Sequence, residues 1–203
     1  MNRFALLLGG PLLVTEALKA RLEGHRLLAA DSGGRHALAL GLTPEVWLGD
    51  FDSSPPWLQS ALPSPKEALP REKDLTDGEA LLQKALALGA GEVLLLGGIG
   101  GRLDHTLAHL ALSFSLAEEG VKVALTDGLT WAYPLLPGTH AFPLAAGTPF
   151  SLLPFPEATL TLEGARWNLP LTHLKATTRT LENEALGAVR IEVATGRALL
   201  YVY

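Results

Sequence analysis

The stretch EVWLGDFDSS, Glu45–Ser54, is an apolar run that ends at a glycine and is followed by two aspartates. In extended backbone, residues i and i+2 project to the same side, so Asp50 and Asp52 are expected to aim their carboxylates at one point. Like charges at that spacing repel unless a cation lies between them, and oxygen-only ligands suit a hard ion such as Mg²⁺. A solvated turn is the alternative, because Gly, Asp and Ser all favour turns.

Apolar runs alternate with helical segments on both sides of this stretch. Five runs are typical of strands buried in a parallel sheet: Phe4–Leu8, Leu27–Ala30, Val46–Leu48, Glu92–Leu96 and Val121–Leu125. Helices are expected at about 15–22, 36–40 and 76–88, and from about 106 to 119. This alternation predicts a mostly parallel, Rossmann-like α/β domain. Asp31, Asp50, Asp52 and the Gly97–Asp104 loop follow strand ends, where open α/β sheets bind ligands.

A segment rich in proline and serine, Ser53–Pro70, follows the acidic turn and is expected to be a loop or a broken helix on the surface. After it, Thr76 and Glu79 match a capping box that opens the next helix. Asp74 and Asp77 flank that helix start. They are candidates for the same site as the earlier aspartates, or acids that complement the helix dipole.

The glycine-rich loop Gly97–Gly101 leads from an expected strand into an expected helix. Its pattern matches neither the dinucleotide-binding fingerprint nor the Walker A motif. Amides at a helix N-terminus still make an anion site, and the Arg102 guanidinium suits phosphate. Asp104 is expected to cap the helix, His105 to position a group by hydrogen bonding, and His109 to be structural.

Helical periodicity stops after Leu129. Short strands are expected near 131–135, 139–144, 149–153, 159–162, 189–193 and 198–202, the last two as a hairpin turning at Ala194–Arg197. Six short strands with turn signals between them predict a β-sandwich. The expected division is therefore an α/β nucleotide domain at 1–129 and a β-sandwich domain at 130–203.

The composition bounds the class of protein. The 203 residues are 48% hydrophobic and 18% charged, enough for a sizeable core. A net charge of −5 without a basic block argues against a nucleic acid or an anionic membrane as partner. There are no cysteines, which excludes disulfides and thiolate chemistry. The N-terminal apolar run is too short for a signal peptide, so a cytoplasmic protein is expected.

Four motifs in this order closely resemble the thiamine pyrophosphokinase family: Asp31–Gly34, Gly49–Ser53, Lys73–Asp77 and Gly100–Thr106. Two later stretches are looser matches. Gly164–Leu169 resembles the family's Gly-x-x-Trp-x-Leu, and Thr180–Glu184 lies where the family carries Ser-x-Ser-Asn, with Glu182 in place of the second serine. The resemblance covers essentially the whole chain. It implies transfer of pyrophosphate from ATP to thiamine with release of AMP, an α/β nucleotide domain followed by a β-sandwich, and a homodimer with thiamine between subunits.

The resemblance also implies roles for individual residues. The expected Mg²⁺ ligands are Asp50, Asp52 and Asp77, and the expected catalytic residues are these three with Asp74 and Arg102. The expected ATP contacts are Asp31, Gly33, Lys73, Thr76, Gly98, Gly100, Gly101, Arg102, Asp104 and His105. Lys73 stands where the family often has a glutamine that contacts thiamine, so its role stays open. The expected thiamine contacts are Trp167, Thr180 and Asn183, with a core tryptophan as the alternative for Trp167.

Two other functions remain open. A metal-dependent nucleotide phosphohydrolase would use the same aspartates to activate water, with no dependence on thiamine. A catalytically silent nucleotide-sensing dimer would bind ATP without turnover. The clustered aspartates disfavour the sensor, and the additional β-rich domain disfavours the hydrolase.

Overall fold

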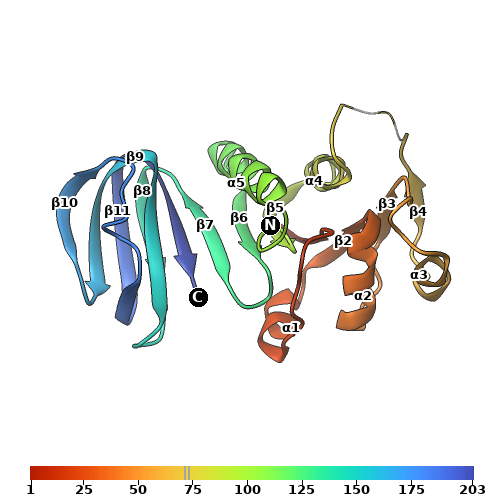
Figure 1. The fold of residues 1–203 in the computed structure, drawn as a ribbon, viewed down its shortest axis with the longest axis horizontal. Helices are drawn as coiled ribbons and strands as arrows, with labels where there is room; N and C mark the ends of the chain where they lie inside the picture. The colour runs from red at the N-terminus through yellow and green to blue at the C-terminus, as the bar shows by residue number, and fades with distance from the viewer. Residues whose placement is uncertain (71, 73) are drawn as a thin grey trace. The chain divides into compact units, whose positions relative to one another are not determined.

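The computed structural model describes residues 1–70, 72 and 74–203. Lys73, an expected ATP contact, lies outside the described residues. The chain divides into two compact units. The first unit comprises Met1–Ala111 and Gly120–Leu129, and the second comprises Leu112–Glu119 and Thr130–Tyr203. Figure 1 shows the chain coloured from red at the N-terminus to blue at the C-terminus.

The first unit contains a parallel sheet. Its strands are β1 (Asn2–Leu7), β2 (Arg26–Ala30), β3 (Val46–Gly49), β4 (Lys66–Ala68), β5 (Ala90–Leu96) and β6 (Lys122–Thr126). They lie in the order β6-β5-β1-β2-β3-β4, and every neighbouring pair is parallel. Phe4 to Leu7 are fully buried, as expected for an apolar strand that is covered on both faces. The carboxyl ends of β1, β2, β3 and β5 therefore meet at one edge of this sheet.

Helices cover the faces of this sheet and mostly begin where the sequence predicts. They are α1 (Glu16–Leu22), η1 (Asp31–Gly33, a 3₁₀ turn), α2 (Gly34–Leu40), α3 (Pro56–Ala61), α4 (Asp77–Ala87) and the first part of α5 (Leu103–Glu118), which belongs to the second unit from Leu112 on. Figure 1 shows α2 and α4 on opposite sides of the sheet. The Thr76 hydroxyl accepts the Glu79 N–H at 3.2 Å and caps α4, which confirms the predicted start of this helix. Among the described residues, no helix has both the length and the hydropathy needed to cross a membrane.

The proline-rich segment is more ordered than the sequence indicates. It contains the short helix α3 and the edge strand β4, which pairs with β3 through Trp47 and Lys66. Pro56 occupies the first turn of α3, where its missing N–H costs nothing, and Leu58 and Leu62 are buried. Buried leucines at a spacing of four tie this segment to the first unit.

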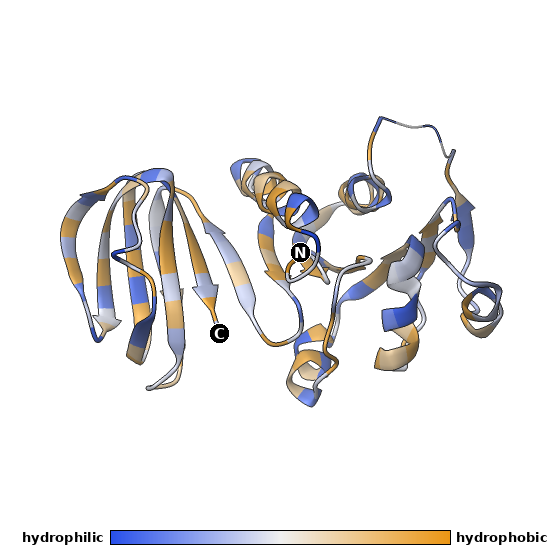
Figure 2. Cartoon of the chain, in the orientation of Figure 1, coloured by the Kyte–Doolittle hydropathy of each residue, from blue (hydrophilic) through white to orange (hydrophobic). Residues whose placement is uncertain are grey.

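The second unit is mostly β-structure. Its strands are β7 (Trp131–Leu135), β8 (Gly138–Phe142), β9 (Pro149–Ala165), β10 (Leu169–Leu174) and β11 (Asn183–Val202). The sequence did not predict β10, and it divided each of the long strands β9 and β11 into two. Buried and exposed residues alternate along much of β11, and Figure 2 shows hydrophobic and hydrophilic residues alternating along the strands of this unit.

The predicted C-terminal hairpin is wrong. Arg190–Val193 pairs with β8 and with Leu160–Glu163 of β9, whereas Ala198–Val202 pairs with β7 and with Phe150–Pro154 of β9. The two halves thus pair with different parts of β9 and with different strands on the other side, β8 and β7, and they do not pair with each other. Gly196, at φ +78°, lets the strand pass close to β9, because a Cβ there would lie 2.2 Å from the Glu157 carbonyl oxygen.

Candidate active site in the first unit and an exposed tryptophan in the second

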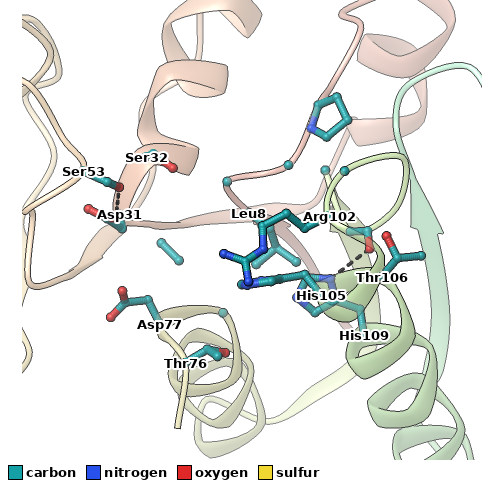
Figure 3. A pocket seen from close by; sticks show the side chains of 18 of the residues that line it. Leu8, Asp31, Ser32, Ser53, Thr76, Asp77, Arg102, His105, Thr106 and His109 are labelled. Atoms are coloured by element: carbon teal, nitrogen blue, oxygen red, sulfur yellow. Dashed lines mark hydrogen bonds between the residues drawn. The ribbon is translucent and has the colours of Figure 1, made fainter. Parts of the chain in front are cut away.

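A pocket of about 820 Å³ lies at the carboxyl edge of the sheet in the first unit. Its lining comes from the ends of β1, β2 and β5 and the starts of α4 and α5. The lining residues are Leu8, Gly9, Gly10, Pro11, Ala30, Asp31, Ser32, Arg35, Ser53, Thr76, Asp77, Gly78, Gly97, Gly98, Gly101, Arg102, His105, Thr106 and His109. Figure 3 shows Asp31 and Asp77 at one end of this pocket and Arg102 and His105 at the other.

Asp31 is held by contacts from both its backbone and its side chain. Its φ of +39° is unusual for a residue with a side chain. The fully buried Trp47 donates its indole N–H to the Asp31 carbonyl oxygen at 2.7 Å. The Asp31 carboxylate accepts hydrogen bonds from the hydroxyls of Ser53 and Ser54, the latter at 3.0 Å. This set of contacts fixes the direction of the carboxylate.

Three carboxylates come together beside the pocket. One oxygen from each of Asp31, Asp50 and Asp77 lies within 4.8 Å of the others, and all three side chains are half-buried. Asp31 and Asp50 follow β2 and β3, and Asp77 is the first residue of α4. Three oxygen donors at this spacing suit a hard divalent cation.

Asp52 lies outside this group of three, contrary to its expected place beside Asp50. Phe51, between them, has φ +60°, so the backbone after Gly49 is not extended and the i, i+2 rule does not hold. The Asp52 N–H instead donates to the Asp50 carboxylate at 3.1 Å, as in a turn centred on Asp50. The sequence predicts Asp52 as the third carboxylate beside Asp50 and Asp77. In the structure this third carboxylate is Asp31, which was expected to contact ATP.

The glycine-rich loop faces a second glycine turn that the sequence did not single out for the site. A Cβ on Gly10 would lie 2.2 Å from the Gly97 carbonyl oxygen, so the two turns are in close backbone contact. The Gly10 carbonyl accepts a hydrogen bond from His36 at 2.8 Å, and the Gly98 carbonyl accepts one from His109 at 2.9 Å. These histidines are structural supports of the pocket.

Burial lowers the pKa of both supporting histidines. Desolvation is the largest cause for His36 and for His109, and the hydrogen bond to a carbonyl opposes it in each case. Electrostatic interaction with Arg35 lowers the pKa of His36 further, and interaction with His105 lowers that of His109. Both rings are therefore neutral at pH 7.

Arg35 lines the pocket and donates to the Gly9 carbonyl at 2.7 Å, so the sequence missed a basic residue of the pocket wall. The sequence could have indicated this role, because Arg35 lies one helical turn after Asp31.

Arg102 lines the pocket and is paired with Asp104. Its guanidinium donates to the two carboxylate oxygens at 3.1 and 2.6 Å, and both side chains are well exposed. Hydrogen bonding to Arg102 and then to the His105 N–H lowers the pKa of Asp104 to about 2. Asp104 is not the residue that caps the N-terminus of α5, contrary to expectation. The helix begins at Leu103, so Asp104 is already its second residue.

The remaining expected contacts of the first unit divide into two groups. Thr76, Gly98, Gly101 and His105 line the pocket. Gly33, Gly100, Asp74 and Asp104 are not among the lining residues. Gly33 is buried, and a Cβ there would lie 2.2 Å from the Leu7 carbonyl oxygen, so its smallness serves packing. Asp74 is exposed ahead of α4.

In the second unit, Trp167 is exposed. Its 58% relative exposure shows that the alternative of a core tryptophan is wrong. The other two expected thiamine contacts are buried: Thr180 donates its hydroxyl to the Leu152 carbonyl, and Asn183 is bonded to the backbone of Trp167. Of the three, Trp167 alone presents its side chain to solvent.

The chain is similar in sequence to thiamin pyrophosphokinases. A family model described as "Thiamin pyrophosphokinase, catalytic domain" matches residues 21–125, just over half of the 203 residues. The thiamine pyrophosphokinase of Bacillus subtilis (strain 168) is 27% identical over 194 residues, which cover 92% of this chain and 91% of that protein.

Solved structures share the fold. The crystal structure of thiamin pyrophosphokinase from Geobacillus thermodenitrificans has a TM-score of 0.82 and 27% identity, covering 98% of this chain and 96% of that one. The crystal structure of the Bacillus subtilis protein has a TM-score of 0.88 at 24% identity, covering 99% and 98%. This chain, a mixed α/β protein with the fold of those structures, belongs to the thiamin pyrophosphokinase family.

Proposed function

We propose that this chain transfers the pyrophosphoryl group of ATP to the hydroxyl of thiamine, giving thiamine diphosphate and AMP. The observation that carries the proposal is the group of three carboxylates, Asp31, Asp50 and Asp77, beside a pocket that also holds Arg102. Family membership supplies the reaction class. Phosphoryl-transfer enzymes work mainly by positioning the reactants and neutralising charge, and these residues are equipped for both tasks.

The donor set fits Mg²⁺. Asp31, Asp50 and Asp77 offer only oxygen ligands, they are half-buried, and the chain has no cysteine that would favour a softer metal. Held there, Mg²⁺ would neutralise charge on phosphate oxygens. The hydrogen bonds from Ser53 and Ser54 keep the Asp31 carboxylate aimed, so little ordering is left for the moment of binding.

The other pocket residues bind and orient the nucleotide in this proposal. Arg102 offers a planar guanidinium to phosphate oxygens, and the glycine turns at Gly10 and Gly97 let a phosphate approach the backbone closely. His105 lines the pocket and would hydrogen-bond a phosphate or the ribose. Asp74, Gly100 and Asp104, which do not line the pocket, remain candidates only for contacts that form on binding, and Lys73 remains a candidate ATP contact.

We further propose that the two units divide the substrates. The first is a Rossmann-like ATP domain, supported by its parallel sheet and by the pocket at the carboxyl edge of that sheet. The second is a β-sandwich that binds thiamine through Trp167 and forms a homodimer, supported by the exposure of Trp167 and by the pairing of the two halves of β11 with β8 and β7, respectively. A cytoplasmic location completes the proposal.

One assay separates this function from its rivals. Protein, ATP and Mg²⁺ are incubated with and without thiamine, and AMP is resolved from ADP by chromatography. AMP together with thiamine diphosphate, formed only when thiamine is present, is the expected result. AMP or phosphate released at the same rate without thiamine would indicate a hydrolase. Nucleotide binding without turnover would indicate a sensor.

A further inference from the structure

One buried side-chain amide holds the exposed Trp167. Asn183 is 4% exposed and lies at the start of β11, sixteen residues from Trp167. We propose that Asn183 is a positioning residue: it does not contact thiamine, but fixes the backbone of Trp167 so that the indole is presented as a rigid stacking surface. This inference rests on the proposed function and assigns a role to Asn183 different from the substrate contact expected from the sequence.

The hydrogen bonds of Asn183 leave little of its side chain for a ligand. Its Nδ2 donates to the Trp167 carbonyl oxygen at 3.0 Å, and its Oδ1 accepts the Trp167 N–H at 3.2 Å. The same Oδ1 accepts the Glu184 N–H at 2.9 Å. An amide oxygen has two lone pairs, so both are in use. Asn183 thus grips Trp167 by both of its backbone polar groups.

The segments on both sides of this clamp are fixed as well. The Arg166 N–H donates to the Glu184 carbonyl at 2.8 Å, and Asn168 Oδ1 accepts the Ala165 N–H at 2.9 Å. Trp167 therefore stands in a short turn whose backbone is tied to β11 and to itself. Rotation of the indole about its two side-chain torsions is the main freedom that remains.

The residue before Asn183 is anchored from the core. Glu182 has φ +56°, and its N–H donates to the Ser151 hydroxyl at 3.1 Å. Ser151 is buried and also bonds the Tyr203 hydroxyl at 2.9 Å. These contacts maintain the left-handed backbone that directs Asn183 toward Trp167.

One side of the indole has a cationic neighbour. The Arg166 guanidinium lies 5.7 Å from the centre of the Trp167 ring and 3.3 Å from the Glu184 carboxylate. Because Glu184 neutralises Arg166, the surface does not carry an uncompensated positive charge that would repel a cationic ring such as the thiazolium of thiamine. A planar ligand would stack on the opposite face of the indole.

The expected gain is preorganisation. A clamped tryptophan loses less freedom when a ring stacks on it, so removing the clamp should weaken binding although the indole is still present. Asn183→Ala should raise the KM for thiamine roughly tenfold, as expected from the loss of one or two net hydrogen bonds, and leave the KM for ATP unchanged. Asn183→Asp keeps the oxygen acceptors and loses the Nδ2 donor, so a smaller increase is expected.

A double-mutant cycle tests whether Asn183 acts through Trp167. With Trp167 already replaced by Ala, the Asn183→Ala change should add less than a twofold effect on the thiamine KM. Asn2→Ala, which removes an exposed asparagine of the first unit that donates to the Leu88 carbonyl, is the control and should change that KM less than twofold. Effects of Asn183→Ala and Trp167→Ala that multiply in the double variant would overturn the proposal.

A second readout needs no turnover. The emission of Trp167 is obtained as the difference between the chain and its Trp167→Phe variant, and its anisotropy reports the mobility of the indole. Asn183→Ala or, where that variant fails to fold, Asn183→Asp should lower this anisotropy. Unchanged anisotropy in the folded variant would refute the clamp. If the natural chain forms no thiamine diphosphate, the proposed function fails while this measurement still decides the clamp.

Discussion

Asp31 in the first unit and Trp167 in the second are both accessible side chains whose backbone is held by a buried one. Trp47 bonds the Asp31 carbonyl, and Asn183 bonds both polar groups of Trp167. The difference lies in the side chains themselves. The Asp31 carboxylate is also fixed by the hydroxyls of Ser53 and Ser54, whereas the indole of Trp167 is left 58% exposed. A cation requires individual oxygens at set positions, whereas a stacked ring requires only a plane.

The largest effect should come from removing a charge from the group of three carboxylates. Asp31→Asn keeps the size and the oxygen acceptor but removes the negative charge. We expect a loss of about a thousandfold in AMP formation at fixed Mg²⁺, because the metal accounts for several kcal/mol of charge stabilisation. The initial rate over a range of Mg²⁺ concentrations measures it, with circular dichroism to verify the fold.

Asp52→Asn is the matched control for this change. Asp52 carries the same charge near the same turn but lies outside the group of three. We therefore expect an effect below about tenfold, as for a charge that does not bind the metal directly. A loss equal to that of Asp31→Asn would show that Asp52 belongs to the metal site. It would also contradict the conclusion that the backbone turn at Phe51 keeps Asp52 out of the group of three.

A medium effect should follow from Trp47→Phe, which deletes the donor to the Asp31 carbonyl and keeps an aromatic ring. An unsatisfied buried carbonyl costs about 1–3 kcal/mol, and the half-buried Asp31 carbonyl should cost less, so thermal unfolding should move modestly to lower temperature. Mg²⁺ binding, followed by calorimetry, should weaken by about tenfold. Trp57→Phe, at an exposed position of α3, should change neither quantity. Stability lost without any change in Mg²⁺ affinity would make Trp47 a packing residue only.

The smallest effect concerns pH. Because burial lowers the pKa of His36 and His109, the unfolded chain takes up their protons first as the pH falls below about 6.5. Stability from these rings is present above that pH and is lost as the pH falls toward their lower folded pKa values. The loss is at most about 1.4 kcal/mol per pH unit for each histidine. The hydrogen bonds of Asn183 involve no group that titrates there, so ATP binding should weaken before Trp167 becomes mobile.

Denaturant unfolding between pH 7.5 and 5 measures this dependence. The variant His36→Gln/His109→Gln retains side-chain donors for the two carbonyls and has no titratable ring, so its stability should change less with pH. If the free energy of unfolding of this variant depends on pH as steeply as that of the natural chain, other groups cause the dependence.

The sequence predicts the sheet of the first unit well, because buried parallel strands are long apolar runs and glycine marks their ends. It also predicts that Asp31 and Asp50 lie at one edge, since carboxyl ends of parallel strands meet there, whereas Asp77, at a helix start, is only a candidate for that site. It fails for Asp52 because Phe51 has φ +60°, with its ring packed edge-on against Trp47 at a centroid distance of 5.1 Å. No periodicity in the sequence encodes such a contact.

The second unit shows a different limit. Ala194–Arg197 has the composition of a hairpin turn, but the strands on either side find partners far away in the chain, so long-range pairing overrides the local signal. Similarly, Asn183 is expected from the sequence to contact a ligand, whereas its burial and its bonds to Trp167 appear only when the backbone is in place.

The pair of Arg102 and Asp104 gives the pocket an internal competitor for anions. A phosphate that binds the guanidinium must displace a carboxylate that already engages it through two hydrogen bonds. Weak anions, such as chloride or a single carboxylate, gain little from that exchange, whereas a chain of phosphates with its own metal ion offers several contacts at once. Because Arg102 is already paired with Asp104, its guanidinium would favour an anion that offers several contacts over a singly charged one.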